Sequence, residues 1–467
     1  MKLLSKTKNI YFIGIGGIGM SGIAEILNEM NFSITGSDIS ENQNTNRLKK
    51  LGIKIYIGQK KENINNVDMV VVSSAIKQNN PEFIKAKSLA IPILPRAKML
   101  SEILHLKSSI TIAGSHGKTT TTSLVASLFE EAKLDPTVIN GGIINTYKTN
   151  AKLGKGEWII AEADESDGSF TYLPSTICLV NNIDPEHLDY YGSFKKLKTA
   201  FLNYVEKIPF YGFASLCIDH KEVREIMKSL KNKKIITYGL SKKANFSIKN
   251  NSIKELDGIF YNKFDVIVDF KKKYEIKDIF FPMLGKHNLQ NALGAISIAS
   301  NIGISDKNIK EGLKNFRGVK RRFTLVKKIN SNKIFDDYAH HPKEISATLL
   351  ALKQITKGKV IAIYEPHRYS RLENLFDDFT NCFNDANFLL ILPVFGAGEK
   401  KSKEFNSQKL VKFINNKMST HAFLIKDKSK LFKKIASFVK PHDNIIFLGA
   451  GPITKLANLF PEYLEEN

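Results

Sequence analysis

The sequence predicts an α/β protein of three domains, built mainly from parallel strands that alternate with helices. At 467 residues the chain is about three times as long as an average domain of ~150 residues. Short apolar runs alternate with helix-like stretches in its first and last thirds, as in parallel, doubly wound sheets. Two glycine loops, at residues 14–19 and 114–117, each follow such a run. These observations indicate a Rossmann-like N-terminal domain, a central P-loop domain with antiparallel hairpins, and a Rossmann-like C-terminal domain.

The first domain is expected at residues 1–107, where strands and helices alternate from the start. A helix should follow the glycine loop and run to Met30. The expected strands are short and apolar, at Ile10–Ile13, Phe32–Thr35, Met69–Val72 and Ile91–Leu94. This alternation predicts a parallel sheet.

The second domain is expected at residues 108–318 and the third at residues 319–467. The central segment alternates polar and apolar residues over Phe246–Phe281, which predicts antiparallel hairpins, and a helix at Leu289–Ile302 should close it. The remaining expected strands are Trp158–Ala161 and Ile177–Asn181 in the centre, and Val360–Ile363, Phe388–Leu392 and Asn444–Leu448 in the third domain.

The first glycine loop fits the pattern G-x-G-x-x-G at Gly14, Gly16 and Gly19, after a strand and before a helix. Such glycines allow a tight turn and let backbone N–H groups approach a pyrophosphate. Asp38 ends the next expected strand, where an acidic residue can bind a ribose hydroxyl. The usual meaning of this pattern is NAD binding, and the alternative is a tight turn without a ligand.

The second glycine loop has the sequence Gly114-Ser115-His116-Gly117-Lys118-Thr119-Thr120, which is typical of an ATP-binding phosphate loop. Lys118 can reach the β- and γ-phosphates, and the Thr119 hydroxyl can ligate Mg²⁺. The loop departs from the full Walker pattern because Ile112 stands where its first glycine is expected. Two phosphate-binding loops on separate domains indicate two phosphorylated ligands.

Acidic and basic side chains cluster at several other strand ends. Carboxylates in Glu162–Asp167 follow one central strand, and Asn181–Asp189 follows the next and contains His187. Acids beside a phosphate-loop strand commonly bind the magnesium of a nucleotide. Arg321-Arg322 and His367–Arg371 supply fixed positive charge suited to phosphate or carboxylate. The alternative is a set of capped turns and surface ion pairs.

The composition narrows the class of protein. Cys178, Cys217 and Cys382 are far apart, which favours a reducing compartment over a disulfide framework or a zinc site. The apolar run near the N-terminus is rich in glycine and lacks a small-residue cleavage site, so we do not interpret it as a signal peptide. No segment reaches the ~18 apolar residues of a membrane span. We therefore expect a cytoplasmic protein without membrane insertion.

The formal net charge of +23 raises nucleic-acid binding as an alternative. Lysines are spread over all three thirds of the chain, without an arginine-rich arm or a recognition motif. We therefore predict no specific nucleic-acid partner. A solvated basic surface would still attract anionic nucleotides.

The motifs together resemble the Mur ligases, the ATP-dependent amino-acid ligases of peptidoglycan synthesis. The matching segments appear in family order along essentially the whole chain: Gly14–Gly22, His116–Thr121, Glu162–Phe170, Asn182–Tyr191, His287–Asn288, Arg321–Phe323, Asp336–Pro342 and Pro366–Tyr369. The resemblance implies that the first domain binds the UDP of a sugar substrate instead of NAD, that the second binds ATP, and that the third completes the ATP site and admits the amino acid.

The resemblance also implies roles for individual residues. ATP contacts are implied at Gly114, Ser115, His116, Gly117, Lys118, Thr119, Thr120, His287, Asn288, Asn291, Arg322 and Asp337. Contacts to the UDP-sugar are implied at Gly14, Gly16, Gly17, Gly19, Ser37, Asp38, Ser73, His367, Arg368 and Arg371. Thr119, Glu162 and His187 would hold Mg²⁺ or Mn²⁺, and the catalytic residues would be Lys118, Glu162, His187 and Arg322. Glu365, Lys152 and Ser115 depart from the family's usual glutamine, arginine and threonine.

The implied reaction is ligation of L-alanine to the lactyl carboxylate of UDP-N-acetylmuramate through an acyl phosphate, with release of ADP and phosphate, by a monomer or weak homodimer. One alternative is a recycling ligase that adds a tripeptide to the same UDP-sugar. A second is a dinucleotide-dependent oxidoreductase fused to a P-loop module, which would leave Arg322 and Asp337 without a role. The selectivity among L-alanine, L-serine and glycine stays open, as does the group that deprotonates the amine.

Overall fold

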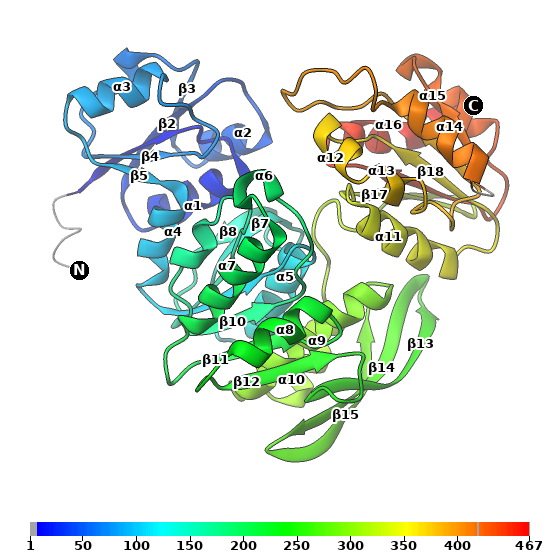
Figure 1. Cartoon of the computed structure of the whole chain (residues 1–467), viewed down its shortest axis with the longest axis horizontal. Coiled ribbons are helices and arrows are strands. Elements are labelled where there is room, and N and C mark those ends of the chain that lie inside the picture. The colour runs from blue at the N-terminus through cyan, green and yellow to red at the C-terminus, as the bar shows by residue number, and fades with distance from the viewer. Residues whose placement is uncertain (1–6, 418–419, 467) are drawn as a thin grey trace. The chain divides into compact units, whose positions relative to one another are not determined.

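The computed structural model describes residues 7–417 and 420–466, which pack as two compact units. The first unit holds the N-terminal and central domains. The second holds the C-terminal domain together with residues 254–261 and 283–289. Each domain has its own sheet (Figure 1), so the predicted α/β fold of three domains is confirmed.

The N-terminal domain has a five-stranded parallel sheet in the order β3-β2-β1-β4-β5. Its elements are β1 (Asn9–Ile13), α1 (Ile18–Glu29), β2 (Ser33–Asp38), α2 (Gln43–Lys50), β3 (Lys54–Ile57), β4 (Met69–Val72), α3 (Pro81–Ser88), β5 (Ile93–Pro95) and α4 (Arg96–Leu104). The four expected strands are present, and β3 was not predicted. The loop after β1 lies where the strand order reverses, which is the usual ligand position in such sheets.

Helix α1 attaches the N-terminal domain to the central domain. Asn150 donates from Nδ2 to the carbonyl of Ile18 at 2.7 Å and accepts from Nη2 of Arg47 at 2.7 Å. A Cβ on Gly22 would lie 2.7 Å from Asn150 Nδ2, so glycine is required for this close approach. Gly22 therefore serves domain packing.

The central domain has a ten-stranded mixed sheet in the order β15-β14-β13-β12-β11-β10-β6-β9-β7-β8. Its strands are β6 (Ser108–Ala113), β7 (Thr137–Ile144), β8 (Thr149–Lys152), β9 (Trp158–Glu162), β10 (Ile177–Val180), β11 (Phe213–Cys217), β12 (Ile235–Gly239), β13 (Phe246–Leu256), β14 (Ile259–Phe270) and β15 (Lys272–Phe281). Its helices are α5 (Lys118–Glu131), α6 (Leu188–Tyr191), α7 (Phe194–Glu206), α8 (Lys221–Ser229), α9 (Lys286–Asn301) and α10 (Asp306–Lys314). Helix α9 begins before its expected start at Leu289.

The expected hairpin region is confirmed by the antiparallel pair β14 and β15. The antiparallel pair β7 and β8 at the other sheet edge was not predicted. These two strands contain Gly141, Gly142 and Thr149, and they do not form a strong period-two apolar pattern. Strand β7 is instead stabilised by pairing with β9 and by packing against α5, contacts that the local sequence pattern does not report.

The C-terminal domain has a six-stranded sheet in the order β16-β17-β21-β18-β19-β20. Its elements are β16 (Thr324–Ile329), β17 (Asn332–Asp337), α11 (Pro342–Gln354), β18 (Val360–Tyr364), α12 (Tyr369–Asn374), α13 (Phe376–Phe379), β19 (Phe388–Ile391), α14 (Ser407–Lys417), β20 (His421–Leu424), α15 (Leu431–Ala436), β21 (Asn444–Leu448) and α16 (Ile453–Glu466). Among the described strands of this domain, only β16 and β17 pair antiparallel, and a tight turn with Asn330 at φ 51° joins them.

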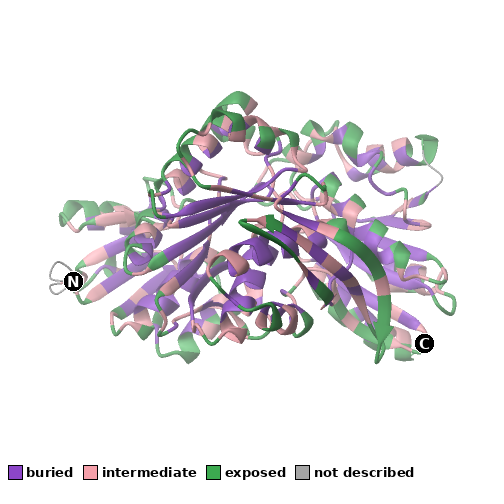
Figure 2. Ribbon diagram, turned by 90° about the horizontal axis from the view of Figure 1, so that it is seen from below, coloured by how far each residue is buried: buried purple, intermediate pink, exposed green. Residues whose placement is uncertain are grey.

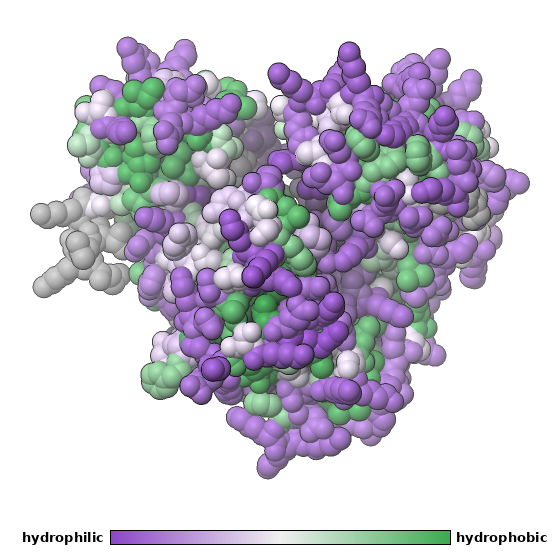
Figure 3. All heavy atoms as spheres, viewed as in Figure 1, coloured by the Kyte–Doolittle hydropathy of each residue, from purple (hydrophilic) through white to green (hydrophobic). Residues whose placement is uncertain are grey.

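The central strands of the sheets form the cores of the domains. Strands β10, β11, β18 and β21 are buried along their whole length, and Figure 2 shows many strands in purple, the colour of buried residues, beside a few that are largely exposed. Hydrophilic residues cover most of the visible surface in Figure 3. Among the described residues, no helix has the length and apolar character that crossing a membrane requires.

Candidate active site

Three chain segments begin at the carboxyl ends of neighbouring strands of the central sheet. Strand β6 pairs in parallel with both β9 and β10, so the ends of these strands at Ala113, Glu162 and Val180 lie side by side. The phosphate loop, the acidic segment and the segment that contains His187 therefore meet there. Parallel pairing at the carboxyl ends of strands is what allows residues so far apart in sequence to form one site.

The phosphate loop requires glycine at both ends. Gly114 has φ +138° and Gly117 has φ +81°, a region that favours glycine. A Cβ on Gly117 would lie 2.5 Å from Asn291 Oδ1, so Asn291, an expected ATP contact, lies against the loop. The amide of His116 donates to Asn182 Oδ1 at 2.8 Å. The loop conformation is thus supported by side chains from the segment after β10 and from α9.

Lys118 begins α5 and points back over the loop. Its Nζ donates to the Gly114 carbonyl at 2.6 Å and to Glu165 Oε2 at 2.7 Å. Burial alone would lower the pKa of Lys118, but the negative charges of Glu165, Asp164 and Glu162 outweigh burial and raise it above its usual range. Lys118 is therefore a fixed positive charge.

The next residues of α5 are buried threonines. Thr119 donates from Oγ1 to Glu162 Oε2 at 2.9 Å, and the same carboxylate oxygen accepts from the Gly141 amide at 2.9 Å. Thr120 is buried in the same turn. A hydroxyl beside a carboxylate offers the hard oxygen ligands that Mg²⁺ prefers, so this pair fits the predicted metal.

His187 lies with two acids that the sequence reasoning did not assign to the site. One ligand atom each from Glu165, Glu186 and His187 lie within 4.8 Å of one another. Burial lowers the pKa of His187, although the charge of Glu186 opposes the shift. The predicted set of Thr119, Glu162 and His187 thus divides into a Thr119–Glu162 pair and a separate His187 cluster. The acidic stretch was recognised in the sequence, but which of its carboxylates faces inward depends on the turn after β9.

A buried aspartate links the phosphate loop to α8. Asp184 Oδ2 lies 3.2 Å from His116 Nε2, and Oδ1 lies 3.3 Å from His220 Nε2. The Asp184 amide donates to Ser115 Oγ at 2.8 Å. His220 was not predicted, because it lies outside every recognised motif. This arrangement holds the side chains of Ser115 and His116 in place.

In the N-terminal domain, the glycine loop is closed by its neighbours. The Gly16 amide donates to Asp38 Oδ2 at 2.8 Å, and the amides of Gly14 and Ile15 donate to the Ser37 carbonyl at 2.9 Å. The Cβ of Ser73 lies 3.1 Å from the position of a Cβ on Gly14. The predicted residues at Gly14, Gly16, Ser37, Asp38 and Ser73 are therefore brought together. An anionic ligand that binds the Gly16 amide would have to share or replace its hydrogen bond to Asp38.

The Ser37 side chain points away from the loop, into a buried network. Its hydroxyl donates to Glu82, which also accepts from the Tyr11 hydroxyl at 2.9 Å. The predicted Gly17 precedes α1, and the predicted Gly19 lies in its first turn. A Cβ on Gly19 would lie 3.0 Å from Arg96 Nη1.

Substitution of Gly16 by alanine is expected to destabilise the protein by about 1–3 kcal/mol, the usual cost of overpacking. The new Cβ would lie 2.5 Å from Asn42 Nδ2 and 2.8 Å from Asp38 Oδ2, and both groups are fixed by hydrogen bonds. Gly17→Ala is the matched control, because the atom nearest to its new Cβ would lie 3.6 Å away and its φ is −61°. Equal thermal stability of the two variants would contradict this account.

Arg96 connects the N-terminal domain to the acidic segment after β9. Its Nη2 lies 3.7 Å from Asp164 Oδ2 and 4.0 Å from Asp167 Oδ2. Arg96 also packs on Gly19 of α1. One side chain therefore contacts both α1 and the acidic segment after β9. The sequence reasoning did not single out Arg96, which stands in no motif.

In the second unit, Arg322 and Asp337 lie beside one aromatic ring. The guanidinium carbon of Arg322 lies 5.1 Å from the centroid of the Tyr338 ring. Asp337 accepts from the amides of Phe323 at 2.6 Å and Ala339 at 2.7 Å. Burial raises the pKa of Asp337 to about 6, although the charge of Arg322 opposes the shift. The two predicted residues are therefore neighbours.

The other predicted residues of the second unit are placed as follows. Asn288 donates from Nδ2 to the Leu284 carbonyl at 2.8 Å, and His287 packs against Gly285. His367 Nδ1 lies 3.2 Å from Arg371 Nη1. Arg368 has the unusual φ of 70°. Such strain in a non-glycine residue is typical of functional loops.

Buried histidines make the folded chain sensitive to acid. Burial lowers the pKa of His287 to about 4 and that of His340 to about 3. The unfolded chain binds these protons near pH 6.5, so their contribution to stability is complete above pH 6.5 and is lost as pH falls towards 4. Asp337 acts in the opposite direction between about pH 4 and 6, because its folded form binds the proton more readily.

His340→Gln isolates one of these contributions. We expect the loss of unfolding free energy between pH 6.5 and 4.5 to be smaller in the variant by about 1.4 kcal/mol per pH unit. Urea unfolding at several pH values measures the two slopes. Equal slopes for the variant and the parent chain would contradict the buried, neutral state of His340.

A third glycine loop, which the sequence reasoning did not note, joins β21 to α16. Gly449 has φ +152°, and the Arg321 guanidinium donates to the carbonyls of Gly449 and Gly451. A Cβ on Gly451 would lie 2.4 Å from Glu365 Oε1. Two glycines after an apolar strand were the available signal.

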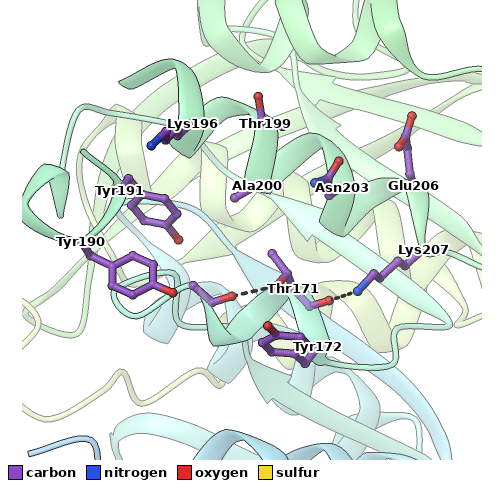
Figure 4. Close-up of a pocket in the computed structure, with 11 residues that line it drawn as sticks. Thr171, Tyr172, Tyr190, Tyr191, Lys196, Thr199, Ala200, Asn203, Glu206 and Lys207 are labelled. Carbon is purple, nitrogen blue, oxygen red and sulfur yellow. Dashed lines mark hydrogen bonds between the residues drawn. The ribbon is translucent and has the colours of Figure 1, made fainter. Parts of the chain in front are cut away.

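A cavity of about 600 Å³ is lined by residues of the short 3₁₀ helix η3 (Ser169–Tyr172), of α6 and of α7 (Figure 4). Tyr172 and Tyr190 line it and are 66% and 57% exposed, so the cavity is open to solvent. Tyr191 also lines it, and its hydroxyl donates to the Glu165 carbonyl. Glu165, which contacts Lys118, is thus hydrogen-bonded to a residue of the cavity wall.

Three family models match the chain in order. They are the Mur ligase family catalytic domain at residues 9–108, the Mur ligase middle domain at residues 112–299, and the Mur ligase glutamate ligase domain at residues 321–451. The chain belongs to the Mur ligase family. Each model covers one of the three sheets, so the three matched domains correspond to the three domains of the structure.

Individual Mur ligases match over nearly the whole length. The UDP-N-acetylmuramate–L-alanine ligase of Parvibaculum lavamentivorans is 48% identical, over 98% of this chain and 93% of its own. That of Agrobacterium fabrum is 46% identical, over 100% of this chain and 98% of its own. The crystal structure of the Thermotoga maritima UDP-N-acetylmuramate–alanine ligase has a TM-score of 0.83 at 26% identity, covering 98% of this chain and 99% of that one.

Proposed function

We propose that this Mur ligase joins L-alanine to UDP-N-acetylmuramate in peptidoglycan synthesis, with ATP as the energy source. The observation that carries the proposal is similarity at 46–48% identity, over almost the full length, to enzymes that bear this name. The buried phosphate-loop lysine and the neighbouring carboxylates support it, because a ligase of this kind must bind ATP. A cytoplasmic location and a monomer or weak homodimer stay predictions.

We assign the UDP-sugar to residues 1–107, ATP to residues 108–318 and the ligase domain to residues 319–467. The grouping of Gly14, Gly16, Asp38 and Ser73 supports the first assignment. The contacts of the phosphate loop with Asn182 and Asn291 support the second. His367, Arg368 and Arg371 remain candidates for the acidic part of the sugar substrate.

The proposed reaction has two steps. The lactyl carboxylate attacks the γ-phosphorus of ATP, and the bond to the bridging oxygen breaks to give an acyl phosphate and ADP. The amine of L-alanine then attacks the acyl carbon, loses a proton and expels phosphate. Phosphorylation is needed because a free carboxylate is a poor electrophile.

Lys118 and Arg322 are the residues proposed to stabilise the phosphoryl group during transfer. Catalysis of phosphoryl transfer rests mainly on positioning and on fixed positive charge. Lys118 is buried and held as a cation by neighbouring carboxylates. Arg322 lies against the Tyr338 ring, beside Asp337. Asp337 is proposed to contact the ATP ribose. His287 and Asn288 are proposed to lie near the adenosine.

Thr119 and Glu162 would hold Mg²⁺, with His187 as a further ligand from the neighbouring cluster. When bound, the ion would neutralise charge on the β- and γ-phosphates. The chain's own contribution is to keep the Thr119 hydroxyl and the Glu162 carboxylate in contact, which the Gly141 amide supports.

A competition among amino acids tests the acceptor. We expect L-alanine to be used in preference to the tripeptide L-alanyl-γ-D-glutamyl-diaminopimelate when both are offered with UDP-N-acetylmuramate and ATP. Mass spectrometry separates the two products. Exclusive use of the tripeptide would identify a recycling ligase instead. Tight NADH binding without ligation would support the oxidoreductase alternative.

A further inference from the structure

The ammonium group of Lys118 already has at least as many hydrogen-bond acceptors as it has protons. A lysine ammonium has three protons, and Nζ lies 2.6 Å from the Gly114 carbonyl, 2.7 Å from Glu165 Oε2 and 3.0 Å from Glu165 Oε1. A phosphate oxygen that contacts Nζ must therefore replace or share one of these acceptors. The contact to Gly114 belongs to the loop itself, which leaves Glu165 as the acceptor to be displaced.

The ion pair is deeply buried. The Glu165 side chain is 1% exposed and the Lys118 side chain is 12% exposed. Charges in such surroundings are screened weakly by solvent and salt. Removing only one partner would leave the other charge buried without compensation. The pair is thus a strong competitor for any anion that approaches Lys118.

The backbone of Glu165 is anchored by two hydrogen bonds. Its carbonyl accepts from the Tyr191 hydroxyl and from the Gly168 amide at 3.0 Å. Figure 4 shows Tyr191 among the residues that line the cavity. Lys118, in contrast, has a long, flexible side chain that can turn towards a ligand while Glu165 stays in place.

We propose that Glu165 is a positioning residue that holds the phosphate-loop lysine and competes with nucleotide phosphates for it. The proposal rests on the proposed function, in which Lys118 contacts ATP. Glu165 keeps the lysine aimed at the loop, and nucleotide binding exchanges the carboxylate for phosphate oxygens. Glu165 therefore sets the affinity for nucleotide instead of acting on the reacting atoms.

Glu165→Gln removes the charge and keeps the shape of the side chain. We expect calorimetry to show ADP or a non-hydrolysable ATP analogue binding about tenfold more tightly, equivalent to about 1.4 kcal/mol. The variant without nucleotide should melt at a lower temperature than the parent chain. In turnover, KM for ATP should fall by more than kcat changes.

Glu130→Gln is the matched control. Glu130 pairs with Lys152 at 2.5 Å near the opposite end of α5, away from the phosphate loop. It removes the same charge from a similar lysine–glutamate pair, so nucleotide affinity should stay within about twofold of the parent value.

A second measurement does not depend on the stability of a variant. In a crystal structure of the parent chain with magnesium and a non-hydrolysable ATP analogue, Lys118 Nζ should contact a phosphate oxygen. Its separation from the Glu165 carboxylate should then exceed hydrogen-bond distance, about 3.5 Å. An ion pair that stays intact beside bound nucleotide would overturn the proposal.

The binding experiment also separates this inference from the proposed function. If the parent chain binds nucleotide and Glu165→Gln binds it equally or more weakly, the competition proposal fails and the ligase function stands. If kcat collapses at unchanged affinity, Glu165 acts in the chemistry and the positioning role is wrong. If the parent chain binds no adenine nucleotide, both proposals fail.

Discussion

Lys118→Ala is expected to reduce turnover by at least about 10²–10³-fold, the usual cost of removing one group that stabilises a developing charge. Lys118 is the buried cation of the phosphate loop, and the Gly114 carbonyl and Glu165 hold it there. Alanine removes the charge from the transferred phosphoryl group. Phosphate release at saturating substrates measures the loss.

The same substitution is also expected to lower stability, by up to about 3–5 kcal/mol, because it leaves the Glu165 carboxylate buried without a partner. The double variant Lys118→Ala with Glu165→Gln removes both charges and should regain most of that stability. It should remain inactive. Recovery of activity in the double variant would mean that the single variant fails by unfolding and that Lys118 has no catalytic role.

Glu162→Gln is the second substitution with a large expected effect, on the order of a 10²-fold fall in kcat/KM. Glu162 Oε2 accepts from both Thr119 and the Gly141 amide at 2.9 Å. A glutamine oxygen can accept the same bonds, so the local structure should persist while the negative charge is lost. The magnesium concentration needed for half-maximal activity should rise.

Glu206→Gln is the matched control for this experiment, because Glu206 is an exposed residue of α7 in the same domain. It should leave the magnesium dependence unchanged. Titration of activity against magnesium compares the three proteins. A Glu162 variant with the magnesium dependence of the parent chain would refute the assignment of Glu162 as a metal ligand.

Much of the fold could be predicted because its strands carry their own signals. Runs such as Met69–Val72 and Asn444–Leu448 are continuously apolar, and the structure places β4 and β21 at these residues. Strands β7 and β16 were not predicted, since each is fixed by its partner strand more than by its own composition. Boundaries such as the start of α9 at Lys286 depend on local turns that periodicity does not report.

The candidate site was predictable where a motif names a conformation. Gly114 and Gly117 have backbone conformations that favour glycine, so their spacing in the sequence predicts the loop. The predicted loop in turn indicates Lys118 and Thr119 as phosphate and metal contacts. Partners such as Glu165 and His220 could not be assigned, because their roles arise when distant strand ends meet. A sequence gives the residue types of such a cluster without showing which of them face inward.

The proposed activity couples cleavage of ATP to ADP and phosphate with the formation of one amide bond. The most direct test is phosphate release from ATP and magnesium with UDP-N-acetylmuramate, with and without L-alanine, together with mass spectrometry of the product. The account predicts rapid release only when both substrates are present, matched by an equal amount of the alanyl adduct. Phosphate release that does not depend on L-alanine, or release without the adduct, would contradict it.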